Sequence, residues 1–282
     1  MKSFPLQARP TFSKNTLIAG ILSIFIVLGF TFFLPPSEDW SNLYRPAAAE
    51  WIAGRNPYAI ERFTNAPWSL LPMVPLLILP EALGRAVLAF SGLIALSWVV
   101  RKFGASLLGL SFFLLSPPVV SLMLDGNIDW LVAIGFILPP QIGLFFIAIK
   151  PQIGIAVAVF WFIQAWQSSG LRGVVKVFAP VTIALIASFI LYGLWPMKYL
   201  LAFSWGGNTS LWPMSLPIGL ALLVTAIRKQ NISYAIAASP CFSPYLLTHS
   251  WIGPLIALAP LTPELIATTS GFWLLMGIWA LR

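Results

Sequence analysis

Long uninterrupted apolar runs constrain the fold of this chain more than any other feature of its sequence. A helix needs about 20 apolar residues to cross the hydrocarbon core of a bilayer. The stretches that approach or reach that length are Thr16–Leu34, Ala82–Val100, Phe103–Leu124, Gln152–Trp166, Val177–Trp195, Pro213–Ile227, Ile232–Thr248 and Glu264–Leu281. The strands of a membrane barrel would instead alternate apolar and polar residues over short segments. The sequence therefore predicts an all-α polytopic membrane protein.

Several further apolar pieces are shorter. Ile128–Leu138 and Gln141–Ile149 are separated by Pro139-Pro140, and Trp251–Leu261 is similar in length. Ser69–Leu79 lies among prolines, which favours a re-entrant or interfacial segment. Interrupted helices at membrane depth usually line a cavity. We expect about 10 or 11 membrane segments, some of them short or broken, within one integral membrane domain, residues 1–282.

Composition supports this interpretation. The chain is 59% hydrophobic and 9% charged, whereas soluble domains are about a quarter charged. The net charge of +8 would suggest nucleic acid in a soluble protein, but beside membrane helices it is explained by topology, so we expect no nucleic-acid partner. Cys241 is the only cysteine, which gives no disulfide framework. Thr16–Leu34 lacks a small-residue cleavage site and is expected to be a retained first helix.

Basic residues predict the orientation, because cytoplasmic loops carry an excess of Lys and Arg. The basic positions near the ends of apolar runs are Lys2, Arg9, Lys14, Arg101, Lys102, Arg172, Lys176, Arg228 and Lys229. Placing them in the cytoplasm puts the loop 35–68, the turn 125–129 and the loop 196–212 outside. Every carboxylate except Glu264 then lies on or near the outer face. We therefore expect the active site on the extracytoplasmic face of the plasma (inner) membrane.

The outer loop 35–68 holds half of the eight carboxylates, Glu38, Asp39, Glu50 and Glu61. Asp39 stands beside Trp40, just after the first apolar run. A carboxylate at the membrane surface that aromatic rings partly screen can accept a proton from a hydroxyl. The alternative is a solvated loop acid, and Glu38 is the neighbouring substitute for the same role.

The segment Asp125-Gly126-Asn127-Ile128-Asp129 is predicted to turn between two membrane runs, since Gly and Asn suit a tight turn. Asp129 is expected to begin the next helix, where an acid interacts favourably with the helix dipole. A purely structural turn is one interpretation. Paired acids that hold a metal or position a sugar hydroxyl are the other.

Lys150 and His249 are the remaining candidates. Lys150 is flanked by apolar runs on both sides, and an ionisable residue at membrane depth is a functional candidate. It can offer a point charge to a phosphate, or extend its side chain to the interface. His249 is the only histidine, so a multi-histidine zinc site is excluded. No nucleotide-binding, Gly-x-Ser-x-Gly or Cys-x-x-Cys motif is present.

The first outer loop resembles that of glycosyltransferase family 87, which belongs to the GT-C superfamily of polyprenyl-phosphate-sugar-dependent transferases. The residues that carry the resemblance are Asp39-Trp40, Tyr44, Ala47-Ala48, Trp51, Gly54 and Asn56-Pro57-Tyr58, followed by a proline-rich stretch at 67–80. Further features similar to the family follow in the same order: Ser116-Pro117, Gly126-Asn127, Lys150-Pro151 and the run Ser243-Pro244 to His249.

The resemblance implies a GT-C fold and an inverting transfer of a hexose such as mannose, or of a pentose, from a polyprenyl-phosphate donor to a glycolipid or glycan acceptor. It implies Asp39 as the base, with His249 and Lys150 near the donor phosphate, and we predict Asp39 and His249 as the catalytic residues. We assign Lys150 and Arg45 to the donor phosphate. The acceptor or sugar is assigned to Glu38, Tyr44, Tyr58, Asn127 and Asp129. No metal or cofactor is expected.

Two other classes stay open. A lipid or solute transporter could use the same outer cavity, and a catalytically silent subunit could support a membrane complex. The glycosyltransferase hypothesis requires Asp39, Lys150 and His249 to face one outer cavity. It places the side chains of Asp39 and His249 within roughly 10–15 Å of each other, which leaves room for a sugar phosphate.

Overall fold

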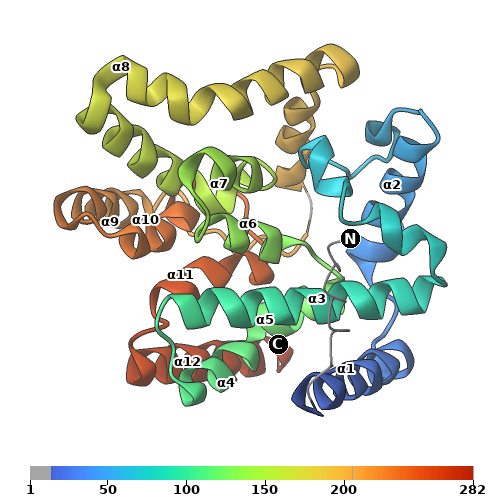
Figure 1. Ribbon diagram of the computed structural model, residues 1–282. Helices are drawn as coiled ribbons and strands as arrows, with labels where there is room; N and C mark the ends of the chain where they lie inside the picture. The colour runs from blue at the N-terminus through green and yellow to red at the C-terminus, as the bar shows by residue number, and fades with distance from the viewer. Residues whose placement is uncertain (1–13, 205, 282) are drawn as a thin grey trace, which may run out of the picture.

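Figure 1 shows the computed structural model, which describes residues 14–204 and 206–281. Lys2 and Arg9, two of the residues used to predict orientation, lie outside the described residues. Every regular element of the described part is a helix, without a β-strand, which confirms the all-α prediction. Three helices are long and apolar enough to cross a membrane, or up to four if one bent pair is a single span.

The first two of these helices pack against each other. α1 (Lys14–Phe33) is apolar along its length and buries none of its residues within the protein. It contacts α3 (Glu81–Lys102), whose buried Arg85 donates a hydrogen bond of 2.9 Å to the carbonyl oxygen of Leu34. Glu81 lies in the first turn of α3 and Arg101 and Lys102 in the last, where each charge interacts favourably with the helix dipole.

The predicted run Phe103–Leu124 is not one helix. It forms α4 (Leu107–Leu114) and α5 (Pro117–Asp125), whose axes are bent by 52°. Pro117 and Pro118 follow Ser116 at the break. Proline cannot donate to the preceding turn and disfavours a helical residue before it, so the first helix ends and a new one begins.

α8 (Pro151–Tyr192) combines the two predicted runs Gln152–Trp166 and Val177–Trp195. Ser169 and Gly170 have non-helical backbone angles, and the φ of Gly170 is 56°. We call residues 151–168 the first arm and residues 171–192 the second arm. The second arm turns back over α7 (Pro140–Ile147), as the upper part of Figure 1 shows.

The other short helices match the predicted short pieces. α6 (Asp129–Gly135) and α11 (Ile252–Ala257) have seven and six residues, about 10 Å each, too short to cross a bilayer alone. α9 (Leu216–Lys229) and α10 (Ile232–Ala238) are also shorter than a span. α12 (Thr262–Ala280) ends the described chain. The predicted total of 10 or 11 membrane segments therefore exceeds the helices of spanning length.

The outer loop 35–68 is folded and not an open loop. It contains the π-helix η1 (Trp40–Tyr44), α2 (Arg45–Ile52) and the 3-10 turns η2 (Pro57–Ala59) and η3 (Pro67–Leu70). The proline-rich piece that follows forms the 3-10 helix η4 (Val74–Ile78). Trp40 and Tyr44 are buried, so this segment packs as part of the core.

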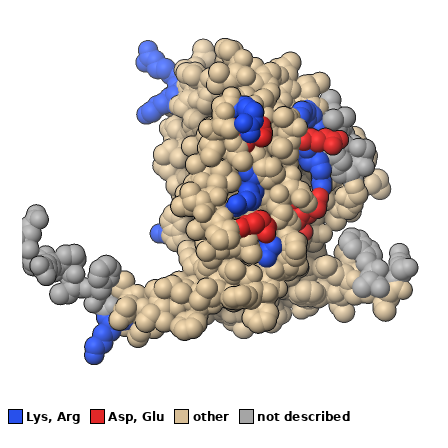
Figure 2. All heavy atoms as spheres, turned by 90° about the vertical axis from the view of Figure 1, so that its right-hand side faces the viewer, with Lys and Arg blue, Asp and Glu red and all other residues tan. Residues whose placement is uncertain are grey.

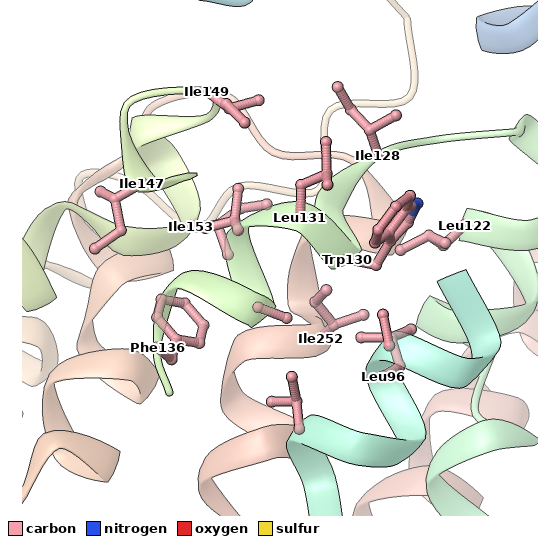
Figure 3. Close-up of a cluster of buried hydrophobic side chains, with 14 of the residues drawn as sticks. Leu96, Leu122, Ile128, Trp130, Leu131, Phe136, Ile147, Ile149, Ile153 and Ile252 are labelled. Carbon is pink, nitrogen blue, oxygen red and sulfur yellow. The ribbon is translucent and has the colours of Figure 1, made fainter. Parts of the chain in front are cut away.

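The core lies where α3, α6, α8 and α11 meet. Figure 3 shows Leu96, Ile128, Leu131, Ile153 and Ile252 from these segments around one apolar centre. α6 and α7 approach closely because both carry glycine: a Cβ on Gly143 would lie 2.5 Å from the carbonyl oxygen of Gly135. This packing holds the turn before α6, where polar side chains gather.

The orientation can be tested at two exposed residues. In Figure 1 the end of α3 and the bend in α8, both beside basic residues, lie on the left, opposite α2. In a Cys241→Ala background, Arg55→Cys should react with an impermeant maleimide on sealed right-side-out vesicles. Lys102→Cys should react only after permeabilisation, because basic turns stay in the cytoplasm. If Lys102→Cys alone reacted in sealed vesicles, the topology would be opposite to the predicted one.

Candidate active site

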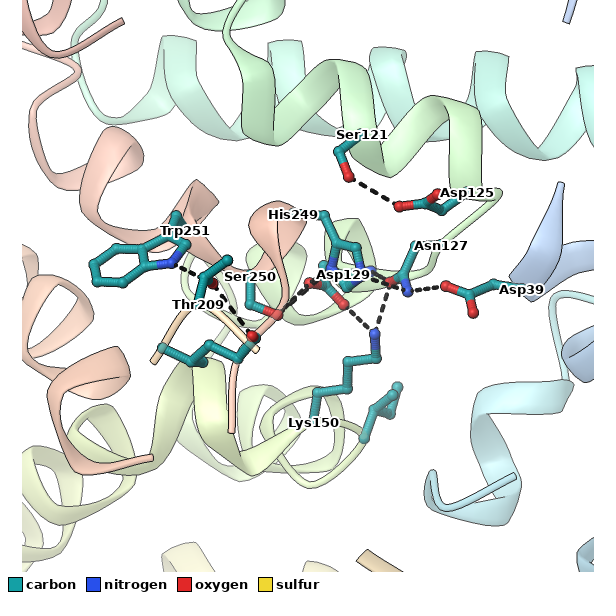
Figure 4. A network of polar contacts seen from close by, with 12 residues as sticks. Asp39, Ser121, Asp125, Asn127, Asp129, Lys150, Thr209, His249, Ser250 and Trp251 are labelled. Carbon is teal, nitrogen blue, oxygen red and sulfur yellow. Dashed lines mark hydrogen bonds and ion pairs between the residues drawn. The ribbon is translucent and has the colours of Figure 1, made fainter. Parts of the chain in front are cut away.

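Four segments bring five polar side chains to one buried point. Asp39 precedes η1, Asn127 lies between α5 and α6, Asp129 begins α6, Lys150 precedes α8, and His249 lies in the 3-10 turn η7 (Thr248–Trp251). Figure 4 shows these side chains pointing toward one another. None is more than 9% exposed. The structure thus brings together residues that are up to 210 positions apart (249 minus 39).

Local sequence explains how the turn before α6 forms. Gly126 adopts the left-handed conformation that ends α5, with φ of 65°, which is the region that favours glycine. Asn127 Oδ1 then accepts a hydrogen bond of 3.1 Å from the backbone N–H of Asp129. Asp129 begins α6 as predicted. Pro151 sits in the first turn of α8, so Lys150 is left just outside the helix.

The carboxylate of Asp129 is fully buried and lies between two nitrogen groups. Lys150 Nζ lies 2.5 Å from Oδ1, and His249 Nδ1 lies 2.7 Å from Oδ2. Ser250 Oγ donates to the same Oδ2 at 3.3 Å. A buried charge is costly unless it is paired and hydrogen-bonded. Asp129 and Lys150 meet this requirement by pairing with each other. The side chain of Lys150 is only 8% exposed, so it does not extend to the interface.

Asn127 connects this pair to Asp39. Its Nδ2 lies 2.5 Å from Asp39 Oδ2 and 3.1 Å from His249 Nε2, while its Oδ1 accepts from Lys150 Nζ at 2.7 Å. Asp39 and His249 contact the same nitrogen atom, so they are much closer than the predicted upper limit. The three residues face one site, as predicted.

The site opens into a pocket of about 600 Å³, counted with its open mouth. The predicted residues that line it are Asp39, Tyr44, Asn127, Lys150 and His249. Other lining residues escaped the sequence analysis: Arg62, Asn65, Gln152, Tyr199 and Tyr245. Arg62 and Asn65 lie in the outer loop that the sequence marked, and Tyr245 lies in the run before His249. Nothing in the sequence marks Tyr199.

Four predicted site residues do not line the pocket: Arg45, Tyr58, Glu38 and Asp129. Asp129 was assigned to the acceptor or sugar, but its fully buried carboxylate contacts Lys150 and His249 instead. Arg45 donates to the carbonyl oxygens of Leu76 and Leu79 and stacks over Trp40, so its guanidinium supports η4 and does not reach the pocket. Tyr58 is 4% exposed and donates to the carbonyl oxygen of Asn65 at 2.7 Å. It was assigned to a sugar but packs among aromatic rings outside the pocket.

Glu38 does not line the pocket, but it pairs with Arg62, which does. Its carboxylate pairs with Arg62 at 2.6 Å, and both side chains are about half exposed, at 57% and 45%. Such a pair contributes little to stability, so Arg62 can exchange Glu38 for another anion. Arg62, and not Arg45, is thus the guanidinium of this loop that lines the pocket.

Tyr44 lines the pocket although it is almost fully buried. Burial, together with the negative charges of Asp39, Asp129 and Asp125, raises the pKa of its hydroxyl. The phenol therefore stays protonated at neutral pH and can donate a hydrogen bond.

The two acids of the turn do not act as a pair. Asp125 accepts from Ser121 Oγ at 2.9 Å, while Asp129 contacts Lys150 and His249. In residues 14–204 and 206–281, no three His, Cys, Asp or Glu side chains gather closely enough to hold a metal ion. The turn thus supplies hydrogen bonds and charge to the neighbouring segments.

An apolar groove adjoins the polar pocket. It has a volume of about 980 Å³, counted with its open side, and runs between the two arms of α8, with Ile155 on one arm and Leu185 and Phe189 on the other. The pocket and the groove share four lining residues, Thr64, Pro151, Gln152 and Tyr199. A ligand with a polar head and an apolar tail can therefore occupy both at once.

Charged side chains gather on the face that carries α2. Figure 2, which looks at the right-hand side of Figure 1, shows basic and acidic residues side by side across an otherwise uncharged surface. Two ion pairs within the loop 35–68 are partly exposed, Arg62 with Glu38 and Arg55 with Glu50.

Comparisons with known proteins add no assignment: no family model, curated protein or solved structure matches the chain. The resemblance to glycosyltransferase family 87 therefore rests on the residues quoted above.

A substitution at Gly126 tests how the turn positions Asn127. A Cβ there would lie 2.7 Å from both Ser37 Oγ and Trp40 Cβ, in addition to the strain at positive φ. Gly126→Ala should lower stability by about 1–3 kcal/mol beyond the strain, measured as the midpoint of thermal unfolding in detergent. Gly54→Ala is the matched control, because Gly54 has φ of 72° and nothing within 4 Å. Equal losses in the two variants would contradict a close approach at Gly126.

Proposed function

We propose that this protein is a membrane glycosyltransferase that uses a polyprenyl-phosphate sugar as its donor and an extracytoplasmic hydroxyl as its acceptor. One observation carries the proposal: a polar pocket with a buried carboxylate opens directly into an apolar groove. A lipid-linked sugar phosphate has the same two parts. The resemblance of the first loop to glycosyltransferase family 87 supports the same donor, and the acceptor is a glycan or glycolipid.

Asp39 is the proposed base. The reaction requires an acceptor hydroxyl to lose its proton while its oxygen attacks the anomeric carbon of the donor. That attack forms the new glycosidic bond as the bond from the anomeric carbon to the phosphate oxygen breaks. The proton passes to Asp39 and the electron pair of the broken bond leaves with the polyprenyl phosphate. Attack opposite to the leaving group inverts the anomeric centre.

Cationic groups near Asp39 support the departure of the phosphate. Arg62 lines the pocket and its ion pair with Glu38 is exposed, so it is the group best placed to bind phosphate oxygens by two N–H donors. Lys150 also lines the pocket, but its charge is balanced by Asp129. We therefore assign the main phosphate contact to Arg62, with Lys150 contributing to the positive side of the site.

The groove accounts for the lipid. Its lining includes Ile155, Leu185, Phe189, Trp195 and Phe242, and each buried CH₂ group contributes about 0.8 kcal/mol. A short stretch of prenyl chain would bind firmly in such a groove. A nucleotide sugar has no apolar part that would use it, which agrees with the lack of nucleotide motifs.

A lipid transporter is the second candidate. The breaks between α4 and α5 and between α6 and α7 favour it, since broken helices often line transport sites. A transporter moves its lipid unchanged, whereas the enzyme forms a glycosidic bond, so the two functions differ in whether a glycosylated product appears.

The Asp39→Asn variant tests the enzymatic function. The amide keeps the size of the side chain but cannot accept a proton at neutral pH, so transfer from a polyprenyl-phosphate sugar should fall by about 10² to 10⁴-fold. Radiolabelled product formed by matched preparations in detergent is the measurement. Glu38→Gln is the control and should keep most of the activity.

Full activity in Asp39→Asn beside an inactive Glu38→Gln would move the role to Glu38. Full activity in both would refute the carboxylate mechanism. No transfer by the wild type with any donor would favour the transporter or the silent subunit.

Filling the groove tests the lipid donor. Ile155→Trp should raise the KM for a long-chain donor by about tenfold, since overpacking costs about 1–3 kcal/mol, and should change the KM for a short-chain analogue little. Steady-state kinetics with both donors measure this difference. Ile190→Trp, on the same helix at an 80% exposed position outside the groove, should change neither. An equal effect on both donors would place the prenyl chain elsewhere.

A further inference from the structure

Asn127 uses every hydrogen-bonding group of its side chain. Its oxygen accepts from Lys150 Nζ at 2.7 Å and from the backbone N–H of Asp129 at 3.1 Å. Its nitrogen faces Asp39 Oδ2 at 2.5 Å and His249 Nε2 at 3.1 Å. A primary amide has two lone pairs on oxygen and two hydrogens on nitrogen, so these four contacts saturate it.

The four partners allow only one orientation of the amide. Turning it over would place its NH₂ group against the ammonium of Lys150 and the N–H of Asp129, which are donors. It would also place the amide oxygen against the carboxylate of Asp39, an acceptor. Lys150 and Asp39 therefore act from opposite sides and hold the NH₂ group toward Asp39 and His249.

This orientation fixes the protonation of His249. Because Asn127 directs an N–H at Nε2, that nitrogen accepts and carries no proton. Nδ1 lies 2.7 Å from Asp129 Oδ2, and the ion pair with Lys150 keeps Asp129 a carboxylate. Nδ1 therefore carries the proton and donates it, which makes the ring neutral.

We propose that Asn127 is a positioning residue, which Lys150 orients so that it holds Asp39 by Oδ2 and keeps His249 as the neutral Nδ1–H tautomer. The catalytic meaning of this arrangement rests on the proposed function, whereas the hydrogen-bond arrangement does not. For transfer it means that Oδ1 of Asp39 takes the proton, since Oδ2 already accepts from Asn127. It also means that Lys150 acts on the base through Asn127.

Asn65 shows that a buried asparagine in this pocket need not have such a role. It is 5% exposed and lines the same pocket, but its Nδ2 donates to the backbone carbonyl of Ile149 at 3.0 Å. Asn127 instead joins side chains from three other segments of the chain.

The single histidine makes the proposal directly measurable. Uniform ¹⁵N labelling of histidine in the full chain gives ring signals from His249 alone. In detergent at neutral pH, the wild type should show a protonated Nδ1 and an unprotonated Nε2. A protonated Nε2 in the wild type, in either the neutral or the doubly protonated ring, would overturn the proposal.

Two variants test whether Asn127 sets this state. Asn127→Asp replaces the donor beside Nε2 with an acceptor, so Nε2 should gain a proton and its signal should shift to that of a protonated nitrogen. Lys150→Met frees the amide to turn and removes the ammonium that balances the charge of Asp129. The ring of His249, which contacts the same carboxylate, should then gain a proton. Asn231→Asp is the control, because Asn231 caps α10 by accepting from the N–H of Ser233, which a carboxylate does equally well; it should leave the spectrum unchanged.

An unchanged Nε2 in both Asn127→Asp and Lys150→Met would refute the positioning role, and if one variant fails to fold the other still decides. The measurement involves no sugar and no turnover. The expected spectra without any transfer activity would therefore contradict the proposed function and leave the role of Asn127 standing. Where transfer is measured, Asn127→Asp should lower kcat more than it raises the KM for the donor, since Asn127 acts through Asp39.

Discussion

The buried carboxylate of Asp129 is the group on which the polar part of this protein depends. Only 9% of the chain is charged, and an unpaired charge at this depth would cost several kcal/mol. Lys150 and His249 provide the compensation, at 2.5 and 2.7 Å. These two contacts join the start of α6, the start of α8 and η7. Lys150 and His249 from these segments line the pocket. The contacts that compensate this buried charge are therefore the same contacts that bring these segments of the pocket together.

Much of this could be predicted from sequence. The apolar runs predicted helices, and the proline pair at 139–140 marked a break, because proline acts locally on the backbone. The pair at 117–118 also ends a helix, but the sequence analysis had placed it inside the single run Phe103–Leu124. Asp39, Asn127, Lys150 and His249 stood out since polar groups are scarce in such a chain. Distances between segments could not be predicted. Arg45 was predicted as a phosphate ligand, whereas Arg62 in the same loop was not considered. Only the packing of η4 against Arg45 shows that this guanidinium is engaged away from the pocket.

The length of a run was also a poor guide to the length of a helix. Ile232–Thr248 is apolar enough to suggest a span, but α10 ends at Ala238 and a 3-10 helix follows over Ser239–Phe242. The chain then continues as irregular backbone to η7, which carries His249. That irregular segment is what brings His249 to Asp129. A continuous helix would satisfy its own backbone and hold the side chain at a fixed rotation and rise. The failure of the simple prediction coincides with the place where the site requires a departure from regular structure.

The same logic connects α8 to the proposed substrate. Non-helical angles at Ser169 and Gly170 let the second arm return beside the first, and the space between the arms is the apolar groove. Lys150 stands immediately before the first arm, so the helix that forms one side of the groove also begins at the polar pocket. The head and tail of an amphipathic ligand would thus be positioned by one element. A groove placed on separate helices would require two packing interfaces to hold the same alignment, whereas here Pro151 and Gln152 belong to both spaces.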